Sequence, residues 1–274
     1  MQEQIIRAIE AVYSRCPLVH SITNFVVMNV TANALLAAHA SPLMAHAAEE
    51  MDDLTDIDSA LVLNIGTLSA EWLESMELAG KLMRAKGKPV VLDPVGAGAS
   101  RLRTEASLRL LDMVRPQILR GNASEIMALA AEIRRTEQRL DKPAPATKGV
   151  DSLNSSHEAV DSARLLAERF GCVVSISGES DFITDGRTVL RVEGGSPLMP
   201  LVTGMGCSAS AVTGAYAAAC DSPLIAAAAA MAVFSSAGEK AALTAKGPGS
   251  FLPAFLDELY NLDKADAARR VSAI

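Results

Sequence analysis

Short apolar runs that alternate with helical patterns constrain the fold of this chain more than any other feature. The runs at residues 61–67 and 89–96 flank a segment with helical character that ends at about residue 86. A strand, a helix and a second strand in this order form a unit whose two strands are parallel. Because the same alternation covers most of the chain, we expect one α/β domain over residues 1–274, with a mainly parallel central sheet and helices on both faces.

Apolar spacing and the positions of glycine and proline divide the chain into expected elements. Helices are expected at residues 3–13, 26–38, between 67 and 86, 104–114, 124–134, 156–170, 208–219, 223–244 and 249–262. Strands are expected at residues 17–24, 41–44, 61–67, 89–96, 117–122, 172–179, 181–184 and 187–192. The segment 142–154 holds two prolines and several polar residues, so we expect a mobile loop there.

Composition and charge favour a globular enzyme with a small-molecule partner. Of the 274 residues, 50% are hydrophobic and 21% are charged, as in ordinary soluble proteins. The net charge is −7, and no basic run is longer than Arg134-Arg135 or Arg269-Arg270, which argues against a nucleic-acid surface. The first residues lack a basic segment followed by an apolar run, and no apolar stretch is long enough to cross a bilayer. We therefore expect a cytoplasmic protein that does not bind membranes.

The four cysteines do not suggest a disulfide framework or a zinc site. They lie at positions 16, 172, 207 and 220, far apart and without Cys-x-x-Cys spacing. Three of them stand beside apolar residues, as small core side chains do. Cys207 differs because glycines precede it where a helix is expected to begin, and the positive end of a helix dipole favours a thiolate or a bound anion.

The stretch 202–215 places two glycines directly before a predicted helix of small residues. Gly204 and Gly206 allow backbone N–H groups to converge on a negative charge. A helix that opens at Cys207 or Ser208 adds the positive end of its dipole. Together with Met205, these glycines are interpreted as an anion hole. A tight turn into a buried helix is the alternative.

Polar residues also follow several expected strands. Asp93 follows an apolar run and suits a metal-bound water or an acceptor hydroxyl, although a turn before proline explains it too. Asn122 and Glu125 stand one helical turn apart where a helix opens, which is also the pattern of a capping box. Arg120 adds positive charge two residues earlier, and an arginine beside acidic residues suits a magnesium-bound phosphate chain. Ser177 offers a hydroxyl at the end of the next strand.

Two residues near the N-terminus are further candidates. The strand expected at 17–24 ends in polar residues that include Asn24, and α/β proteins place ligand contacts at such strand ends. Met44 ends the following strand, where it is either a gap-filling core residue or the wall of a pocket for an apolar heterocycle.

Ordered motifs along nearly the whole chain give a more specific prediction. They are Pro-Leu-Val-His-x-x-Thr-Asn at 17–24, Ser-Pro-x-Met at 41–44, Asn-Ile-Gly-Thr-Leu at 64–68, Asp-Pro-Val at 93–95, Arg-Gly-Asn-Ala-Ser-Glu-Ile at 120–126, Ser-Gly-Glu at 177–179, Thr-Asp-Gly at 184–186 and Gly-x-Gly-Cys at 204–207. In these motifs the chain resembles the hydroxyethylthiazole kinase family of the ribokinase-like superfamily, which acts in thiamine biosynthesis and salvage. The resemblance implies a ribokinase-like α/β fold. It also implies transfer of a phosphoryl group from ATP, with Mg²⁺, to the primary alcohol of 4-methyl-5-(2-hydroxyethyl)thiazole.

The resemblance assigns roles on the substrate side. Met44 and Gly204 would contact the thiazole substrate, with Asn24 nearby. Cys207 stands where most ribokinase-like enzymes carry the aspartate base of a Gly-x-Gly-Asp motif. Enzymes of the family are similar homotrimers with substrate sites at subunit boundaries, so the resemblance implies a homotrimer.

On the nucleotide side, the resemblance implies that Arg120 and Ser177 contact ATP, while Asp93 and Glu125 organise Mg²⁺ and its waters. The chain departs from the family pattern at two positions. Met205 replaces the usual threonine of Gly-Thr-Gly-Cys and removes a hydroxyl near the phosphate path. Ser177 also replaces a more usual threonine, but it keeps the hydroxyl.

Three other functions remain open from the sequence. Other ribokinase-like enzymes, such as a hydroxymethylpyrimidine kinase or an ADP-dependent hydrate dehydratase, normally keep an aspartate at the position of Cys207. A cysteine-nucleophile hydrolase would need a histidine partner, and His20, His39, His46 and His157 show no sequence support for that role. A thiazole-binding module without catalysis is the third, and ATP turnover would exclude it.

Overall fold

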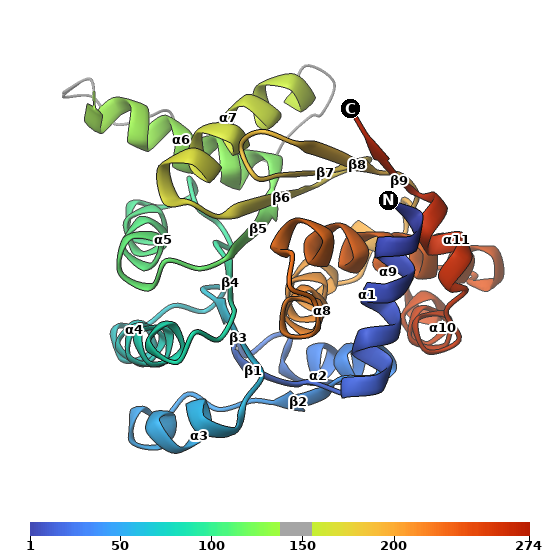
Figure 1. The fold of residues 1–274 in the computed structure, drawn as a ribbon, viewed down its shortest axis with the longest axis horizontal. Helices are drawn as coiled ribbons and strands as arrows, with labels where there is room; N and C mark the ends of the chain where they lie inside the picture. The colour runs from blue at the N-terminus through green and yellow to red at the C-terminus, as the bar shows by residue number, and fades with distance from the viewer. Residues whose placement is uncertain (138–154) are drawn as a thin grey trace.

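Residues 1–137 and 155–274 are described by the computed structural model, so the loop expected at 142–154 lies outside the described residues. Within these ranges, nine strands form one sheet in the order β2-β1-β3-β4-β5-β6-β7-β8-β9 (Figure 1). Six neighbouring strands, from β2 to β6, are parallel, and β7, β8 and β9 extend the sheet in antiparallel fashion. The expected mainly parallel α/β architecture is therefore confirmed.

The strands are short, as expected for apolar runs of this length. Their bounds are β1 Leu18–Ile22, β2 Ser41–Leu43, β3 Ala60–Asn64, β4 Val90–Asp93, β5 Ile118–Asn122, β6 Val173–Ser177, β7 Asp181–Thr184, β8 Val189–Val192 and β9 Val271–Ala273. Every residue of β3 and β4 is buried, because helices cover both faces of the central strands.

Helices lie on both sides of the sheet (Figure 1). Their bounds are α1 Gln2–Arg15, α2 Met28–Ala37, α3 Met51–Ile57, α4 Ala70–Ala85, α5 Arg101–Val114, α6 Ala123–Glu137, α7 Ser155–Phe170, α8 Met205–Ala219, α9 Pro223–Thr244, α10 Pro248–Tyr260 and α11 Lys264–Arg269, with short 3₁₀ turns η1 Ala48–Glu50 and η2 Met199–Leu201. One hydrophobic cluster joins the sheet to α1, α2, α8, α9 and α10. A second cluster joins the opposite face to α4, α5, α6 and α7.

Small residues allow α8 to pack directly on the sheet. A Cβ atom at Gly214 would lie 2.6 Å from the Val62 side chain of β3, so only glycine fits at this contact. Contrary to the expectation that no apolar stretch could cross a bilayer, α9 is long and apolar enough by length and composition, but 83% of its apolar window is buried inside the protein. That burial is typical of a core helix.

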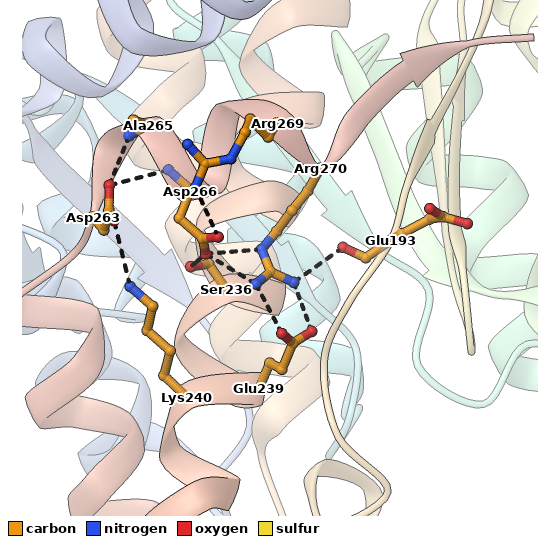
Figure 2. Close-up of polar contacts among 9 residues, drawn as sticks. All are labelled: Glu193, Ser236, Glu239, Lys240, Asp263, Ala265, Asp266, Arg269 and Arg270. Carbon is orange, nitrogen blue, oxygen red and sulfur yellow. Dashed lines mark hydrogen bonds and ion pairs between the residues drawn. The ribbon is translucent and has the colours of Figure 1, made fainter.

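A half-buried arginine, Arg270, fastens the last elements of the chain to α9 (Figure 2). The Arg270 guanidinium donates to Glu239 at 2.8 and 3.1 Å and to Asp266 at 2.9 and 3.1 Å. Ser236 of α9 donates to the same carboxylate of Asp266 at 2.7 Å. Arg270 also donates to the Glu193 carbonyl at 3.5 Å. The network thus holds the segment after β8, which continues into the glycine stretch before α8.

Most expected elements are confirmed, and three were missed. The sequence did not predict α3, α11 or β9. In α3, only Met51 and Thr55 are buried, so the apolar spacing of a helix face is absent. In β9, Val271 alone is buried, and one buried residue gives no alternation to recognise.

Candidate functional site

The carboxyl ends of three strands meet in one hydrogen-bonded cluster. Asn24 follows β1, Asn64 ends β3 and Asp93 ends β4, where Asn64 and Asp93 are paired in the sheet. The Asn24 amide donates to Asn64 Oδ1 at 2.9 Å, and the Asn64 amide donates to Asp93 Oδ2 at 2.7 Å. All three side chains are buried. Asn24 and Asp93, each expected at the end of a strand, therefore lie at the same edge of the sheet, and Asn64 joins them.

Backbone contacts fix the orientation of both amides. Asn64 Oδ1 also accepts the Gly66 N–H at 3.0 Å, and Asn24 Oδ1 accepts the Val26 N–H at 3.1 Å. A Cβ atom at Gly66 would lie 2.5 Å from the Asn24 amide nitrogen, so this position requires glycine. Each amide therefore has one allowed orientation.

Asp93 is a buried carboxyl with a strongly shifted pKa. Its Oδ2 atom also accepts the Ser210 hydroxyl of α8 at 2.7 Å. The pKa of Asp93 is raised to about 7, chiefly by burial and also by Glu125, against the lowering effects of Arg120 and of the hydrogen bonds from Ser210 and Asn64. A cation near this carboxyl would favour its ionised form.

The glycine stretch forms the N-terminus of α8. Gly204 is the N-cap with φ of 85°, a left-handed conformation that suits glycine, and a Cβ atom there would lie 2.8 Å from Val30. The helix therefore begins at Met205, earlier than the expected start at Cys207 or Ser208. No side chain caps this end, which leaves the first-turn N–H groups of residues 205–207 free to bind a ligand.

Met205 contributes to this site through its backbone. Its side chain is only 6% exposed and belongs to the hydrophobic cluster around α8 and α9. The side chain that replaces the family's threonine therefore points into the core. The interpretation of Met205 as part of an anion hole concerns its N–H group alone.

Arg120 places an unusual positive charge beside this helix end. The residue lies in β5 and is only 6% exposed. Its Nη1 atom donates to the Gly206 carbonyl at 2.9 Å, while Nε is buried without a hydrogen-bond partner. Among the ion pairs of residues 1–137 and 155–274, none within 4.0 Å involves Arg120. A buried cation without a carboxylate partner, next to free helix N–H groups, is suited to bind an anion.

Cys207 is half-buried beside the same cluster, and its thiol accepts a hydrogen bond from the Asn24 amide at 3.5 Å. Burial raises the pKa of Cys207 to about 11, and the nearby Asp93 raises it too. Of the two species that the sequence suggested for this helix start, a thiolate or a bound anion, the thiolate is not favoured, because burial and the neighbouring Asp93 raise the pKa of Cys207. A nucleophilic cysteine needs a thiolate and a histidine base. Because the pKa of Cys207 is raised and no histidine among the described residues bonds to its thiol, the site argues against a cysteine-nucleophile hydrolase.

Glu125 and Asn122 form a capping box, the structural alternative that their spacing in the sequence also allowed. Asn122 Oδ1 accepts the Glu125 N–H at 2.9 Å, and Glu125 Oε2 accepts the Asn122 N–H at 2.9 Å. Glu125 Oε1 accepts the Gly96 N–H at 2.8 Å, which fixes the loop after Asp93. Glu125 is thus a structural carboxylate that also raises the pKa of Asp93.

The two carboxylates fit a magnesium site that relies on substrate and water. Among the described residues, no group of three or more metal-ligating side chains could hold a metal ion on its own. Magnesium commonly takes one or two protein carboxylates and completes its shell with phosphate oxygens and waters. Asp93 and Glu125 match that donor set.

Ser177 lies at the end of β6, paired with Asn122 of β5, so it faces the capping box across the sheet. Its hydroxyl donates to the Gly121 carbonyl at 3.4 Å. The turn after it is held by Asp181, which the sequence did not single out: this buried carboxylate accepts the Gly178 N–H at 3.1 Å and the Ser235 hydroxyl at 3.3 Å. Burial raises the pKa of Asp181 to about 6.

Met44 stands apart from the hydrogen-bonded cluster. It is half-buried directly after β2 and packs against the hydrophobic cluster on the α8 side of the sheet. Because β2 pairs with β1, Met44 and Asn24 follow neighbouring strand ends. The structure supports the gap-filling interpretation and leaves a pocket-wall role as a proposal.

Comparison with known proteins identifies the family. The model of the hydroxyethylthiazole kinase family matches residues 9–265. The chain belongs to the hydroxyethylthiazole kinase family. A hydroxyethylthiazole kinase of Nitratidesulfovibrio vulgaris (strain DSM 19637 / Miyazaki F) is 56% identical over 269 residues, which cover 98% of this chain and 97% of the relative. One of Brachyspira hyodysenteriae is 52% identical over 271 residues, which cover 99% and 98% of the two chains.

Solved structures agree with the hydroxyethylthiazole kinase assignment. The hydroxyethylthiazole kinase of Pyrococcus horikoshii OT3 superposes with a TM-score of 0.88 at 41% identity and 99% coverage of both chains. The Staphylococcus aureus pyridoxal kinase, solved in complex with ADP, gives a TM-score of 0.60 at 17% identity and covers 82% of this chain and 88% of that chain. This second likeness shows the fold alone. The expected ribokinase-like α/β fold is confirmed.

In this member of the hydroxyethylthiazole kinase family, three residues without a predicted role also organise the site. Asn64 was quoted in a motif without a role, yet it links Asn24 to Asp93. Ser210 lies one helical turn after Cys207 and binds Asp93, a spacing that could have revealed it. Arg103 of α5 donates to the carbonyls of Ile65, Gly66 and Val95 and thereby fixes two loops, but no sequence signal marks it.

Proposed function

We propose that this protein transfers the γ-phosphoryl group of ATP to the primary alcohol of 4-methyl-5-(2-hydroxyethyl)thiazole. The observation that carries the proposal is the buried Arg120, without an ion-pair partner among the described residues, beside the uncapped N-terminus of α8. The names of the relatives, at 56% and 52% identity, supply the substrate. One continuous nine-stranded sheet supports one kinase domain over residues 1–274.

The anion hole stabilises the charge of the transferred phosphoryl group. Phosphoryl transfer has a loose transition state, so positioning and charge neutralisation provide most of the catalysis. The glycine stretch of Gly204, Met205 and Gly206 presents the free first-turn N–H groups of residues 205–207, and these groups and the Arg120 guanidinium supply fixed positive charge. Ser177, at the end of the neighbouring strand, adds a hydroxyl for the nucleotide phosphates.

Asp93 and Glu125 would hold Mg²⁺ together with its waters and the ATP phosphates. The bound ion supplies charge neutralisation for the phosphate chain. Burial holds the pKa of Asp93 near neutrality, and a bound cation lowers that pKa toward the ionised form. The Glu125 carboxylate also fixes the backbone of the loop after Asp93, because it accepts the Gly96 N–H.

The acceptor alcohol binds between the amide cluster and the glycine stretch. Asn24 and Gly204 contact the thiazole substrate, and Met44 forms an apolar wall. Cys207 stands beside the Asn24 amide, where it orients the acceptor hydroxyl and assists its deprotonation. Because the thiol remains protonated at neutral pH, its contribution as a base is small.

A coupled assay of ADP release tests the function directly. The purified protein is given ATP, Mg²⁺ and either the thiazole alcohol or hydroxymethylpyrimidine, and the phosphorylated product is identified by mass spectrometry. We expect thiazole phosphate, formed only when ATP and Mg²⁺ are both present. Folded protein that phosphorylates only the pyrimidine, or neither alcohol, contradicts the proposal. Ester hydrolysis that thiol reagents abolish would favour the hydrolase instead.

Replacement of Cys207 distinguishes assistance from an essential covalent role. Cys207→Ala is expected to retain measurable activity, with a loss of about a hundredfold or less, because general-base assistance in a loose transfer lies at the low end of its range. Cys207→Asp, which restores the carboxylate usual in the superfamily, should be active as well. Initial rates at saturating ATP check this, with circular dichroism as the folding control. An inactive but folded alanine variant would show that the thiol is indispensable.

Exposed apolar residues beside the site support a contact with another subunit, as the proposed homotrimer with shared substrate sites requires. Phe25 and Val26 directly follow Asn24 and are 67% and 64% exposed, and Leu201, shortly before Gly204, is 63% exposed. Such exposure next to a ligand site is typical of a surface that another subunit covers. Analytical ultracentrifugation at micromolar concentration should give the mass of a trimer. A monomer would contradict the proposed trimer.

The net charge of −7 and the buried α9 fit a cytoplasmic enzyme with neither nucleic acid nor membrane as a partner.

A further inference from the structure

His20 is the residue of the Pro-Leu-Val-His motif to which the proposed reaction gives no role. The side chain lies in β1 and is fully buried. Its Nδ1 atom is 3.2 Å from Asp58 Oδ2, and its Nε2 atom is 3.1 Å from the Ala45 carbonyl oxygen. A buried histidine with partners on both ring nitrogens has a single allowed ring orientation.

The chemistry of the partners assigns the hydrogen atoms. A backbone carbonyl only accepts, so Nε2–H of His20 donates to Ala45. The Nδ1 atom then faces the Asp58 carboxyl, 3.2 Å away. Asp58 is itself fixed by Lys88, whose ammonium group lies 3.6 Å from Oδ1 and donates to the Asp58 carbonyl at 2.6 Å. The donor toward Ala45 is thus oriented by Asp58, which Lys88 in turn holds in place.

The anchored carbonyl belongs to the segment that carries Met44. Residues 44–47 connect β2 with η1 outside regular secondary structure. His46, one residue after the anchored carbonyl, packs against Trp72 of α4 with ring centroids 4.6 Å apart. His20 and Trp72 therefore hold neighbouring positions of the same segment, one through a hydrogen bond and one through ring packing.

We propose that His20 is a positioning residue for the substrate pocket. Its Nε2–H anchors the Ala45 carbonyl and so fixes Met44 as the apolar wall against which the thiazole ring binds. This inference rests on the proposed function for the identity of the ligand. The anchor itself is a statement about the protein alone.

A pair of isosteric variants separates the anchor from the bulk of the ring. In His20→Gln, the side-chain amide nitrogen reaches the place of Nε2 and can donate to Ala45. In His20→Asn, the amide reaches only the place of Nδ1, so the bond to Ala45 is lost. We expect His20→Asn to raise the KM for the thiazole alcohol about threefold to tenfold, the effect of one net hydrogen bond, with the KM for ATP within about twofold of wild type. His20→Gln should lie close to wild type.

Trp72 provides a readout that does not depend on catalysis, because it is the only tryptophan in the chain. Loss of the anchor should loosen the contact of His46 with Trp72 and increase the quenching of tryptophan fluorescence by acrylamide. We expect this increase in His20→Asn and wild-type quenching in His20→Gln. Equal quenching in all three proteins overturns the anchor, whether or not the protein is a thiazole kinase.

Two further outcomes decide the remaining parts of the inference. The pocket role of His20 is overturned if wild type phosphorylates the thiazole alcohol and His20→Asn has an unchanged KM for it. The role is also overturned if His20→Asn raises the KM for the thiazole alcohol and the KM for ATP together.

The wild-type protein supplies a measurement that needs no variant. Its ¹⁵N spectrum should contain one imidazole N–H that exchanges slowly with solvent, and the absence of any protected imidazole N–H overturns the hydrogen bond to Ala45.

Discussion

Gly206→Val is expected to reduce kcat for phosphoryl transfer about a hundredfold to a thousandfold, the usual effect of losing one oxyanion-hole donor. Gly206 occupies the first turn of α8, and its backbone is exposed. A Cβ atom there would lie 3.1 Å from Arg120 Nη1, which already donates to the Gly206 carbonyl. A branched side chain therefore displaces the guanidinium and also covers the N–H groups that face the phosphate.

Gly249 provides a matched control for this substitution. It also lies in the first turn of a helix, one residue after Pro248 at the start of α10, and a Cβ atom there would meet nothing within 4 Å. Gly249→Val should leave kcat within about twofold of wild type, because a first-turn valine alone costs little helix stability. Initial rates at saturating ATP and thiazole alcohol, with circular dichroism for folding, make the comparison. A normal rate in Gly206→Val would show that this turn does not bind the transferred phosphoryl group.

Much of the site could be predicted because parallel strands end at the same edge of the sheet. Once residues 17–24 and 89–96 were assigned as strands of one parallel sheet, Asn24 and Asp93 had to follow strand ends at the same edge of that sheet, and β3 lies between these two strands. The capping box at Asn122 and Glu125 could also be read directly from its spacing. These predictions rest on local patterns and on one topological rule, so they do not require knowledge of packing.

The missed features depend on packing that a local pattern does not contain. The pKa of Cys207 follows from burial and from Asp93, a residue more than a hundred positions away in the chain. The early start of α8 follows from the left-handed backbone of Gly204, which is packed against Val27 and Val30. Met205, as the first residue of this helix, lies in its first turn with its side chain in the core.

Arg120→Met is expected to lower kcat/KM for ATP about a hundredfold to a thousandfold, since arginines that stabilise phosphoryl transfer often contribute as much or more. Methionine keeps an unbranched apolar side chain in the cavity of the arginine but removes the charge. The site loses its buried cation, while the N–H groups of α8 remain. Arg120→Lys keeps the charge without the planar donor fork, so its activity should lie between those of methionine and wild type.

Stability provides the second half of this test. A buried charge without an ion-pair partner is costly to the fold, and its removal is often neutral or stabilising. The Tm of Arg120→Met should therefore stay within a few degrees of wild type or rise, even though the bond to the Gly206 carbonyl is lost. Arg187→Met, at an exposed position in the β7–β8 turn, controls for loss of net charge and should retain full activity. Normal activity together with a sharp fall in Tm for Arg120→Met would show that Arg120 stabilises the fold and does not bind phosphate. The proposed anion hole would then lack its main positive charge.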